Sequence, residues 1–244
     1  MFDLDAAFDA DYLRFYRPEV DGDVAEHEAA TIAELLQLEP GETVLDLACG
    51  HGRIAVPLAR GGFSVTGLDR QSDYLAAAER AAADAGVVVD WRAGDLRELR
   101  DDARFDAAFS WFTSFGYFDE ATDRDVLARV FRALRPGGRF LLETANLFRV
   151  VLEDDAHVVL RDGHDLMIDH RTYDPITGRQ TYHRTFVGGE RPPRDVEFSV
   201  RVFTFPELRD WLTAAGFVDV VPFGADGEPF ATDSERLIVT CRRP

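Results

Sequence analysis

The chain has 244 residues, a length that suits one α/β domain with an insertion. Acidic residues number 45 against 27 basic ones, all arginine, and the formal net charge is −18 at pH 7. A surface of this sign repels phosphate backbones, which argues against a nucleic-acid substrate. The two cysteines, Cys49 and Cys241, are too few for a disulfide framework or a cysteine-based zinc site.

The composition also bears on location and habitat. The sequence contains no apolar run of about eighteen residues and no basic-then-apolar leader, so a soluble cytoplasmic protein without membrane contact is expected. An acidic, lysine-free composition is typical of proteins from salt-loving organisms. A GC-rich genome or an ordinary solvated acidic surface would also produce it.

Residues 1–40 are expected to form a helical entry or lid segment, with an amphipathic helix at about 24–38. The chain then turns into a strand at 44–47 that runs into a glycine turn, followed by a helix at 53–60. Gly50 and Gly52 remove the Cβ atoms that would keep a ligand from the backbone, and the helix directs free N–H groups into the turn. This pattern predicts a cradle for a nucleotide cofactor.

A second strand at 63–68 ends at Asp69, about twenty residues beyond the turn, where a βαβ nucleotide unit carries its ribose-binding carboxylate. Asp69 could instead cap the helix expected at 71–85. The third glycine of dinucleotide dehydrogenases is missing. Asp46 would repel a pyrophosphate but could orient a cationic ligand. A positively charged cofactor with a ribose, such as S-adenosylmethionine, fits better.

The remaining elements alternate and then change character. Strands are expected at 87–92, 105–110 and 139–144, with a helix at 119–134 that ends in the turn at 135–138. Residues 157–204 show period-two stretches, with strands near 166–173, 180–187 and 196–203 and a hairpin turn at 174–178. A helix at 206–215 and strands at 218–222 and 236–241 complete the pattern.

These elements predict an α/β, doubly wound, mostly parallel seven-stranded Rossmann-like sheet with an antiparallel β insertion after the fifth core strand. The expected boundaries are 1–40 for the entry segment, 41–150 for the cofactor-binding core, 151–204 for the insertion and 205–244 for the end of the sheet. Ligands bind at the carboxyl edge of such sheets, where the insertion emerges. It is therefore expected to roof a substrate pocket, to supply a dimer surface, or to do both.

The chain resembles the class I S-adenosylmethionine-dependent methyltransferases over nearly its whole length. The resemblance is greatest to bacterial and archaeal small-molecule enzymes with a "TSFGYF"-like segment, which include sugar N,N-dimethyltransferases. The Asn-Pro-Pro-Tyr signature of amino methyltransferases acting on nucleic-acid bases and protein glutamine is absent, so a small free substrate is expected. The matching segments are VLDLACGHGR (44–53), GLDRQSDYL (67–75), GDLREL (94–99), FDAAFSWFTSFGYF (105–118), LRPGGRFLLE (134–143) and FPELRDWLTAAGF (205–217).

The resemblance implies that thirteen residues contact S-adenosylmethionine. The glycines would meet its methionine part, Asp69 its ribose and Asp95 its adenine. Asp95 could instead cap the following helix, Tyr16 could belong to a packed amphipathic helix, and Arg53 could be a solvated first-turn residue. The set is Tyr16, Asp46, Ala48, Gly50, Gly52, Arg53, Asp69, Arg70, Asp95, Leu96, Ser110, Trp111 and Ser114.

Tyr117, Asn146 and His170 are the candidate catalytic residues. Tyr117 ends the aromatic run after the fourth strand, although core packing explains part of that run. Asn146 follows the fifth strand, and His170 or His183 could act as a base, although a strand histidine is more often exposed or structural. The spacing of the acidic and histidine residues in 164–170 matches no tetrahedral pattern, so no metal is expected.

The sequence thus predicts in-line transfer of a methyl group to nitrogen or oxygen of a small-molecule acceptor, by a monomer or homodimer. Two alternatives remain at this point. One is a catalytically silent cofactor-binding scaffold, and the other is a nicotinamide-dependent oxidoreductase.

Overall fold

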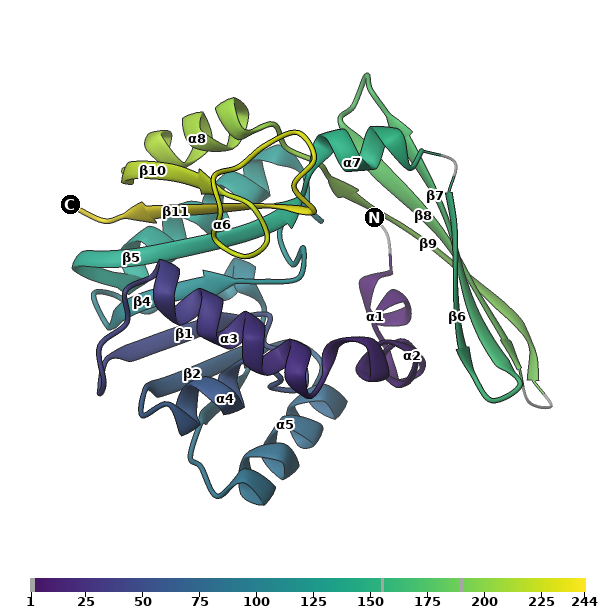
Figure 1. Cartoon of the computed structure of the whole chain (residues 1–244), viewed down its shortest axis with the longest axis horizontal. Helices are drawn as coiled ribbons and strands as arrows, with labels where there is room; N and C mark the ends of the chain where they lie inside the picture. The colour runs from purple at the N-terminus through teal and green to yellow at the C-terminus, as the bar shows by residue number, and fades with distance from the viewer. Residues whose placement is uncertain (1–2, 155, 189–190) are drawn as a thin grey trace.

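A seven-stranded sheet, sheet A, forms the centre of the computed structural model, which describes residues 3–154, 156–188 and 191–244 (Figure 1). Its strand order is β10-β11-β5-β4-β1-β2-β3; β1 to β5 are parallel, β11 runs antiparallel to β5, and β10 runs antiparallel to β11. The strands are β1 (Thr43–Leu47), β2 (Ser64–Asp69), β3 (Asp90–Ala93), β4 (Phe105–Ser110), β5 (Leu134–Ala145), β10 (Val218–Phe223) and β11 (Arg236–Arg242).

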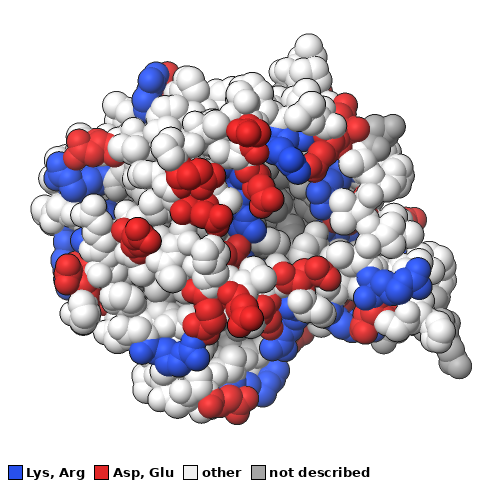
Figure 2. Space-filling view, viewed as in Figure 1, with Lys and Arg blue, Asp and Glu red and all other residues white. Residues whose placement is uncertain are grey.

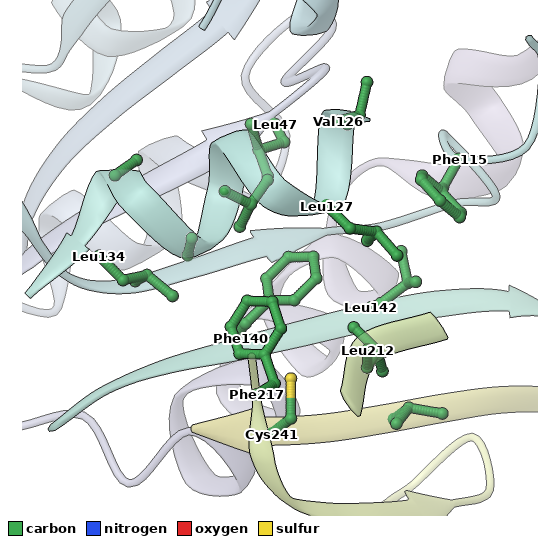
Figure 3. Close-up of a cluster of buried hydrophobic side chains, with 14 of the residues drawn as sticks. Leu47, Phe115, Val126, Leu127, Leu134, Phe140, Leu142, Leu212, Phe217 and Cys241 are labelled. Carbon is green, nitrogen blue, oxygen red and sulfur yellow. The ribbon is translucent and has the colours of Figure 1, made fainter. Parts of the chain in front are cut away.

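Helices cover both faces of sheet A because the central strands are apolar on both sides. On one face, α3 (Asp23–Leu35) and α4 (Ala55–Arg60) pack their apolar residues on the sheet, with α5 (Ser72–Ala85) beside α4. On the other face lie α6 (Glu120–Ala133), the short 3-10 helix η1 (Leu96–Glu98) and α8 (Phe205–Ala214). Figure 3 shows this second core, where Phe140 of β5 stacks on Phe217 beside Leu127 of α6 and Leu212 of α8.

Sheet B is a four-stranded antiparallel insertion that follows β5 and the short helix α7 (Leu147–Leu152) (Figure 1). Its strands, in order, are β6 (Ala156–Asp162), β7 (Asp165–Asp174), β8 (Arg179–Gly188) and β9 (Arg191–Arg201). Side chains alternate between its two faces. Met167 and Asp169 of β7, Arg184 of β8 and Phe198 of β9 are buried, and they belong to the face that packs on the rest of the molecule.

Two N-terminal helices, α1 (Leu4–Ala7) and α2 (Ala10–Val20), lie between sheets A and B (Figure 1). Phe15 of α2 packs on Met167 and Phe186 of sheet B. On the opposite side, the Tyr74 hydroxyl of α5 donates a 3.0 Å hydrogen bond to the Asp9 carbonyl. The N-terminal segment is therefore fixed to both sheets.

The predicted fold is confirmed, with differences in single elements. The strand predicted at 87–92 begins only at Asp90, because Val88 is 91% exposed and this edge strand pairs only with β2. Residues 135–138, predicted as a turn, belong to β5. The sequence did not predict β6 as a separate strand. Among the described residues, no helix combines the length and apolar character needed to cross a bilayer.

Candidate functional site

A cavity of about 390 Å³ lies at the carboxyl ends of β1, β2 and β4. Residues of sheet A and its loops, of α1 and α2, and of sheet B all contribute to its lining. One part, here called the glycine-turn end, is defined by Asp46, Ala48, Gly50, Asp69 and Asp95. The other, the aromatic end, is defined by Tyr12, Tyr16, Tyr117, Tyr182 and Phe198.

Asp69 lines the cavity while it also organises the backbone around it. Its Oδ2 accepts a 2.8 Å hydrogen bond from the Gly50 N–H, and its Oδ1 accepts one of 2.8 Å from Gln71 at the start of α5. Burial raises the pKa of Asp69, although the backbone donors oppose this shift. Each carboxylate oxygen can accept a second bond, so Asp69 can hold the turn and bind a ligand hydroxyl together.

Four buried polar atoms of residues that line the cavity lack hydrogen-bond partners, Trp111 Nε1 and Arg171 Nε among them. The other two lie close to the glycine turn. They are Oδ2 of Asp46, at the end of β1, and Nη2 of Arg53, beyond the glycine turn. The other Arg53 terminal nitrogen binds the Glu28 carboxylate of α3, so Arg53 is not a freely solvated residue. Burial raises the pKa of Asp46 to about 8; the Arg53 charge opposes this shift and the Asp69 charge adds to it. Asp46 thus has a hydrogen-bond acceptor, and Arg53 a donor, that no described protein group satisfies.

Gly52 and Ser110, two of the predicted cofactor contacts, do not line the cavity. Gly52 has a φ of +79°, and a Cβ there would lie 2.6 Å from the Trp91 ring of β3. Its missing side chain therefore serves packing between the turn and β3. Ser110 is buried at the end of β4, behind the residues that line the cavity.

Asp95 caps a helix, as one of its two interpretations held, and it also lines the cavity. Its carboxylate caps η1 by accepting a 2.9 Å hydrogen bond from the Arg97 N–H, and it lines the cavity beside Leu96. Burial acts to raise its pKa, but the hydrogen bonds and charge of Arg97 outweigh this and lower the pKa overall. Arg70 also lines the cavity, and it forms a 2.9 Å ion pair with Asp5 in the first turn of α1.

The loop after β4 reaches the cavity through a strained backbone. Phe112 and Thr113 both have positive φ values, +62° and +54°. The carboxylate of Glu143, buried near the end of β5, accepts a 2.7 Å hydrogen bond from the Thr113 N–H and holds this shape. No local pattern indicates this role of Glu143, because it lies thirty positions from Thr113 in the chain. Trp111 and Ser114 line the cavity as predicted, and Ser114 Oγ donates to the Trp111 carbonyl at 2.8 Å.

Tyrosine rings from three parts of the chain form the aromatic end. The Tyr12 and Tyr16 rings of α2 are 4.5 Å apart, and the Tyr182 ring of β8 stacks on Phe198 at 4.7 Å. Tyr117, from the loop after β4, lines the same space. Burial raises the pKa of all four phenols, that of Tyr182 to about 12, so they are protonated hydrogen-bond donors at neutral pH.

Beneath these rings lies a buried ion pair. Arg184 of β8 donates to both Asp169 carboxylate oxygens, at 2.7 and 2.8 Å, and to the Ala7 carbonyl at 2.7 Å. Neither Arg184 nor Tyr182 was predicted to belong to the site. The period-two pattern of the strand at 180–187 would have placed them on one face, but the sequence does not show that this face meets the N-terminal helices.

Two predicted catalytic residues lie elsewhere. Asn146 caps α7, and its amide donates to the carbonyls of Ala231, Thr232 and Ser234, so the structure does not bring it to the cavity. His170 alternates with the inward Asp169 and Arg171, and its ring stacks on His157 on the other face of sheet B. Within the described ranges, no three His, Cys, Asp or Glu side chains are arranged to hold a metal ion.

Comparisons with known proteins find similarity to methyltransferases. Residues 44–138 match a family model described as a methyltransferase domain. A putative methyltransferase of Geobacillus sp. is 25% identical over 82% of this chain and 84% of its own length. The cypemycin N-terminal methyltransferase of Streptomyces sp. is 28% identical over 83% and 84%.

The chain carries a methyltransferase domain. The fold agrees, because the structure of CalS10, an amino pentose methyltransferase from Micromonospora echinaspora bound to S-adenosylmethionine, superposes with a TM-score of 0.70 at 20% identity and covers 97% of this chain and 98% of its own. The predicted class, an S-adenosylmethionine-dependent methyltransferase, is confirmed. The methyltransferase domain includes the glycine-turn end of the cavity, whereas most of the aromatic end comes from outside residues 44–138.

Proposed function

We propose that this methyltransferase methylates nitrogen or oxygen of a small-molecule acceptor bound at the aromatic end of the cavity. The observation that carries the proposal is the pair of partnerless atoms, Asp46 Oδ2 and Arg53 Nη2. They offer an acceptor for an ammonium and a donor for a carboxylate, which are the two charges of a methionine group. Asp69 would hold the ribose, and Asp95 with Leu96 the adenine.

Bound S-adenosylmethionine would supply a methyl group made electrophilic by the sulfonium. The protein must then hold the acceptor in line and exclude water. Trp111 and the rings of the aromatic end provide a largely apolar enclosure for this purpose. The strained Phe112–Thr113 loop lines the cavity, and the carboxylate of Glu143 holds its backbone.

The lining of the aromatic end favours an amine nitrogen over a hydroxyl. The titratable groups of the five residues that define this end are phenols with raised pKa values, and Arg171 and Arg184 of sheet B add guanidinium groups to the cavity lining. None of these is a general base at neutral pH. A neighbouring guanidinium and burial both lower the pKa of a bound ammonium, so an amine can lose its proton without a dedicated base.

A binding and turnover experiment tests the proposal. Calorimetric titration should show binding of S-adenosylmethionine and S-adenosylhomocysteine but not of NADH. Asp69→Ala should weaken both by about tenfold or more, because it removes charge-assisted hydrogen bonds. Tyr117→Phe is the matched control: it should keep cofactor affinity and lower turnover with an amine acceptor. Cofactor binding without methyl transfer to any amine, sugar or hydroxyl acceptor in a panel would support the silent-scaffold alternative instead.

A further inference from the structure

Four arginines line the cavity, and three of them have a carboxylate partner. Arg53 pairs with Glu28, Arg70 pairs with Asp5, and Arg184 pairs with Asp169. The lining carboxylates, Asp46, Asp69 and Asp95, belong to the glycine-turn end. The charges of the aromatic end are therefore supplied by guanidinium groups.

Arg171 of β7 is the fourth of these arginines. Within the described part of the chain it forms no ion pair, and its Nε is buried without a hydrogen-bond partner. Its guanidinium lies 5.3 Å from the centre of the Tyr182 ring, and its charge acts to lower the pKa of Tyr16, which burial raises overall. A half-buried cation without a counter-charge is unfavourable. The chain has 45 acidic residues, yet none of those described forms an ion pair with Arg171. This suggests that a bound ligand supplies the negative charge.

We propose that the methyl acceptor carries an anionic group, a carboxylate or a phosphate, that binds Arg171. This inference rests on the proposed function, because it places the acceptor at the aromatic end. The planar guanidinium presents paired N–H donors that match either oxyanion, and the free Nε can supply one of them. The rings of Tyr12, Tyr16, Tyr182 and Phe198 surround the space beside it and suit an apolar or flat body. The acceptor class is thus an anionic small molecule with an apolar portion.

The test uses the protein saturated with S-adenosylhomocysteine and simple aromatic probes. Benzoate, phenyl phosphate and the uncharged benzamide are titrated calorimetrically into wild type, Arg171→Gln and Arg171→Lys. At least one anion should bind wild type about tenfold more tightly than benzamide and lose about tenfold in Arg171→Gln. Arg171→Lys should lose less, because it keeps the charge. Preference for benzoate or for phenyl phosphate separates a carboxylate acceptor from a phosphorylated one.

Arg149→Gln provides the matched control, because Arg149 is an exposed arginine of α7 that pairs with Glu153 outside the cavity. It should bind the probes like wild type. Equal binding of anions and benzamide, no anion binding to wild type, or unchanged anion binding in Arg171→Gln would each overturn the inference. S-adenosylhomocysteine affinity, measured for every variant, reports folding and tests the cofactor site separately. If the wild-type protein does not bind S-adenosylhomocysteine, the proposed function is contradicted. If it does bind, the comparison of the Arg171 variants tests the anion site separately from the cofactor site.

Discussion

The protonation state of the Asp46 carboxyl group should depend on whether a ligand is bound. This group is buried near the end of β1 in the lining of the cavity, and its Oδ2 has no hydrogen-bond partner. With a pKa of about 8, it holds a proton in the empty site at neutral pH. An ammonium group needs the ionised carboxylate as its partner, so binding of the methionine group has to release that proton.

We expect the affinity for S-adenosylhomocysteine to rise with pH between about 6 and 8, by up to about tenfold per unit, because one proton leaves on binding. Calorimetry in buffers with different ionisation enthalpies measures both the affinity and the proton released. Asp46→Asn should bind weakly and without this pH dependence. A pH-independent affinity of the wild-type protein would contradict the assigned role.

The same shift has a consequence for the empty protein. Burial raises the pKa of Asp46 from the ordinary carboxyl range to about 8, so the ligand-free fold loses stability as the pH rises from about 4 to about 8. Asp46→Asn should therefore unfold at a higher temperature than wild type at pH 8, and at nearly the same temperature at pH 4. This opposite effect on stability and on binding separates a ligand role from a purely structural one.

At the scale of elements, the Arg184–Asp169 pair joins sheet B to the N-terminal helices. The pair lies within sheet B, and the third hydrogen bond of Arg184 reaches the Ala7 carbonyl at the end of α1. Nearby, Arg194 of β9 donates to the Ala6 carbonyl and pairs with Asp9. The aromatic end exists only while these contacts hold α1 and α2 against sheet B.

Arg184→Met should destabilise the protein by about 3–5 kcal/mol, because it leaves the buried Asp169 charge without a partner. Chemical denaturation followed by tyrosine fluorescence measures this change. The double variant Arg184→Met with Asp169→Leu should recover much of the lost stability, since both charges are then absent. Equal stability of the single and double variants would show that the pair is not the origin of the effect.

The elements of sheet A could be predicted because their local patterns and their packing agree. Short stretches of sequence suffice to predict the buried apolar strands, the glycine turn and the place of Asp69. Parallel strands then bring their carboxyl ends together at one edge of the sheet. The glycine-turn end of the cavity follows from this, with the exceptions of Gly52 and Ser110. Even there, the sequence did not show that Gly52 is needed for the approach of Trp91, because their contact joins separate elements.

The aromatic end could not be predicted in the same way. Which face of sheet B meets α1 and α2 depends on contacts between residues more than 150 positions apart, such as Arg184 with Ala7. Asn146 follows the end of β5, as expected of a site residue. Its side-chain amide nitrogen, however, donates hydrogen bonds to backbone carbonyls of the loop at 231–234. Long-range hydrogen bonding, not local pattern, decided both outcomes.

At the scale of the whole molecule, excess negative charge dominates. Figure 2 shows acidic groups gathered on the visible face with arginines between them. Many arginines are engaged in ion pairs, such as Arg17 with Asp21 and Arg149 with Glu153. With 45 acidic residues against 27 arginines, acidic groups remain in excess after such pairing and repel one another.

The unfolding temperature should therefore rise by several degrees between low salt and roughly 1 M KCl, where the screening length falls to about 3 Å. Calorimetric scans at fixed pH measure this rise, and sucrose at matched osmolality is the control for non-ionic effects. An unchanged or lower unfolding temperature in salt would mean that the screened ion pairs outweigh the screened repulsion. The salt-adapted interpretation of the composition would then be abandoned.

The cavity draws its two ends from different stretches of chain, and this division has an evolutionary consequence. The glycine-turn end comes from the methyltransferase domain at 44–138, while Arg171, Tyr182, Arg184 and Phe198 come from an insertion with its own sheet. With the acceptor bound at the aromatic end, as proposed, substitutions on the inward face of that insertion would alter acceptor choice and leave the cofactor cradle intact.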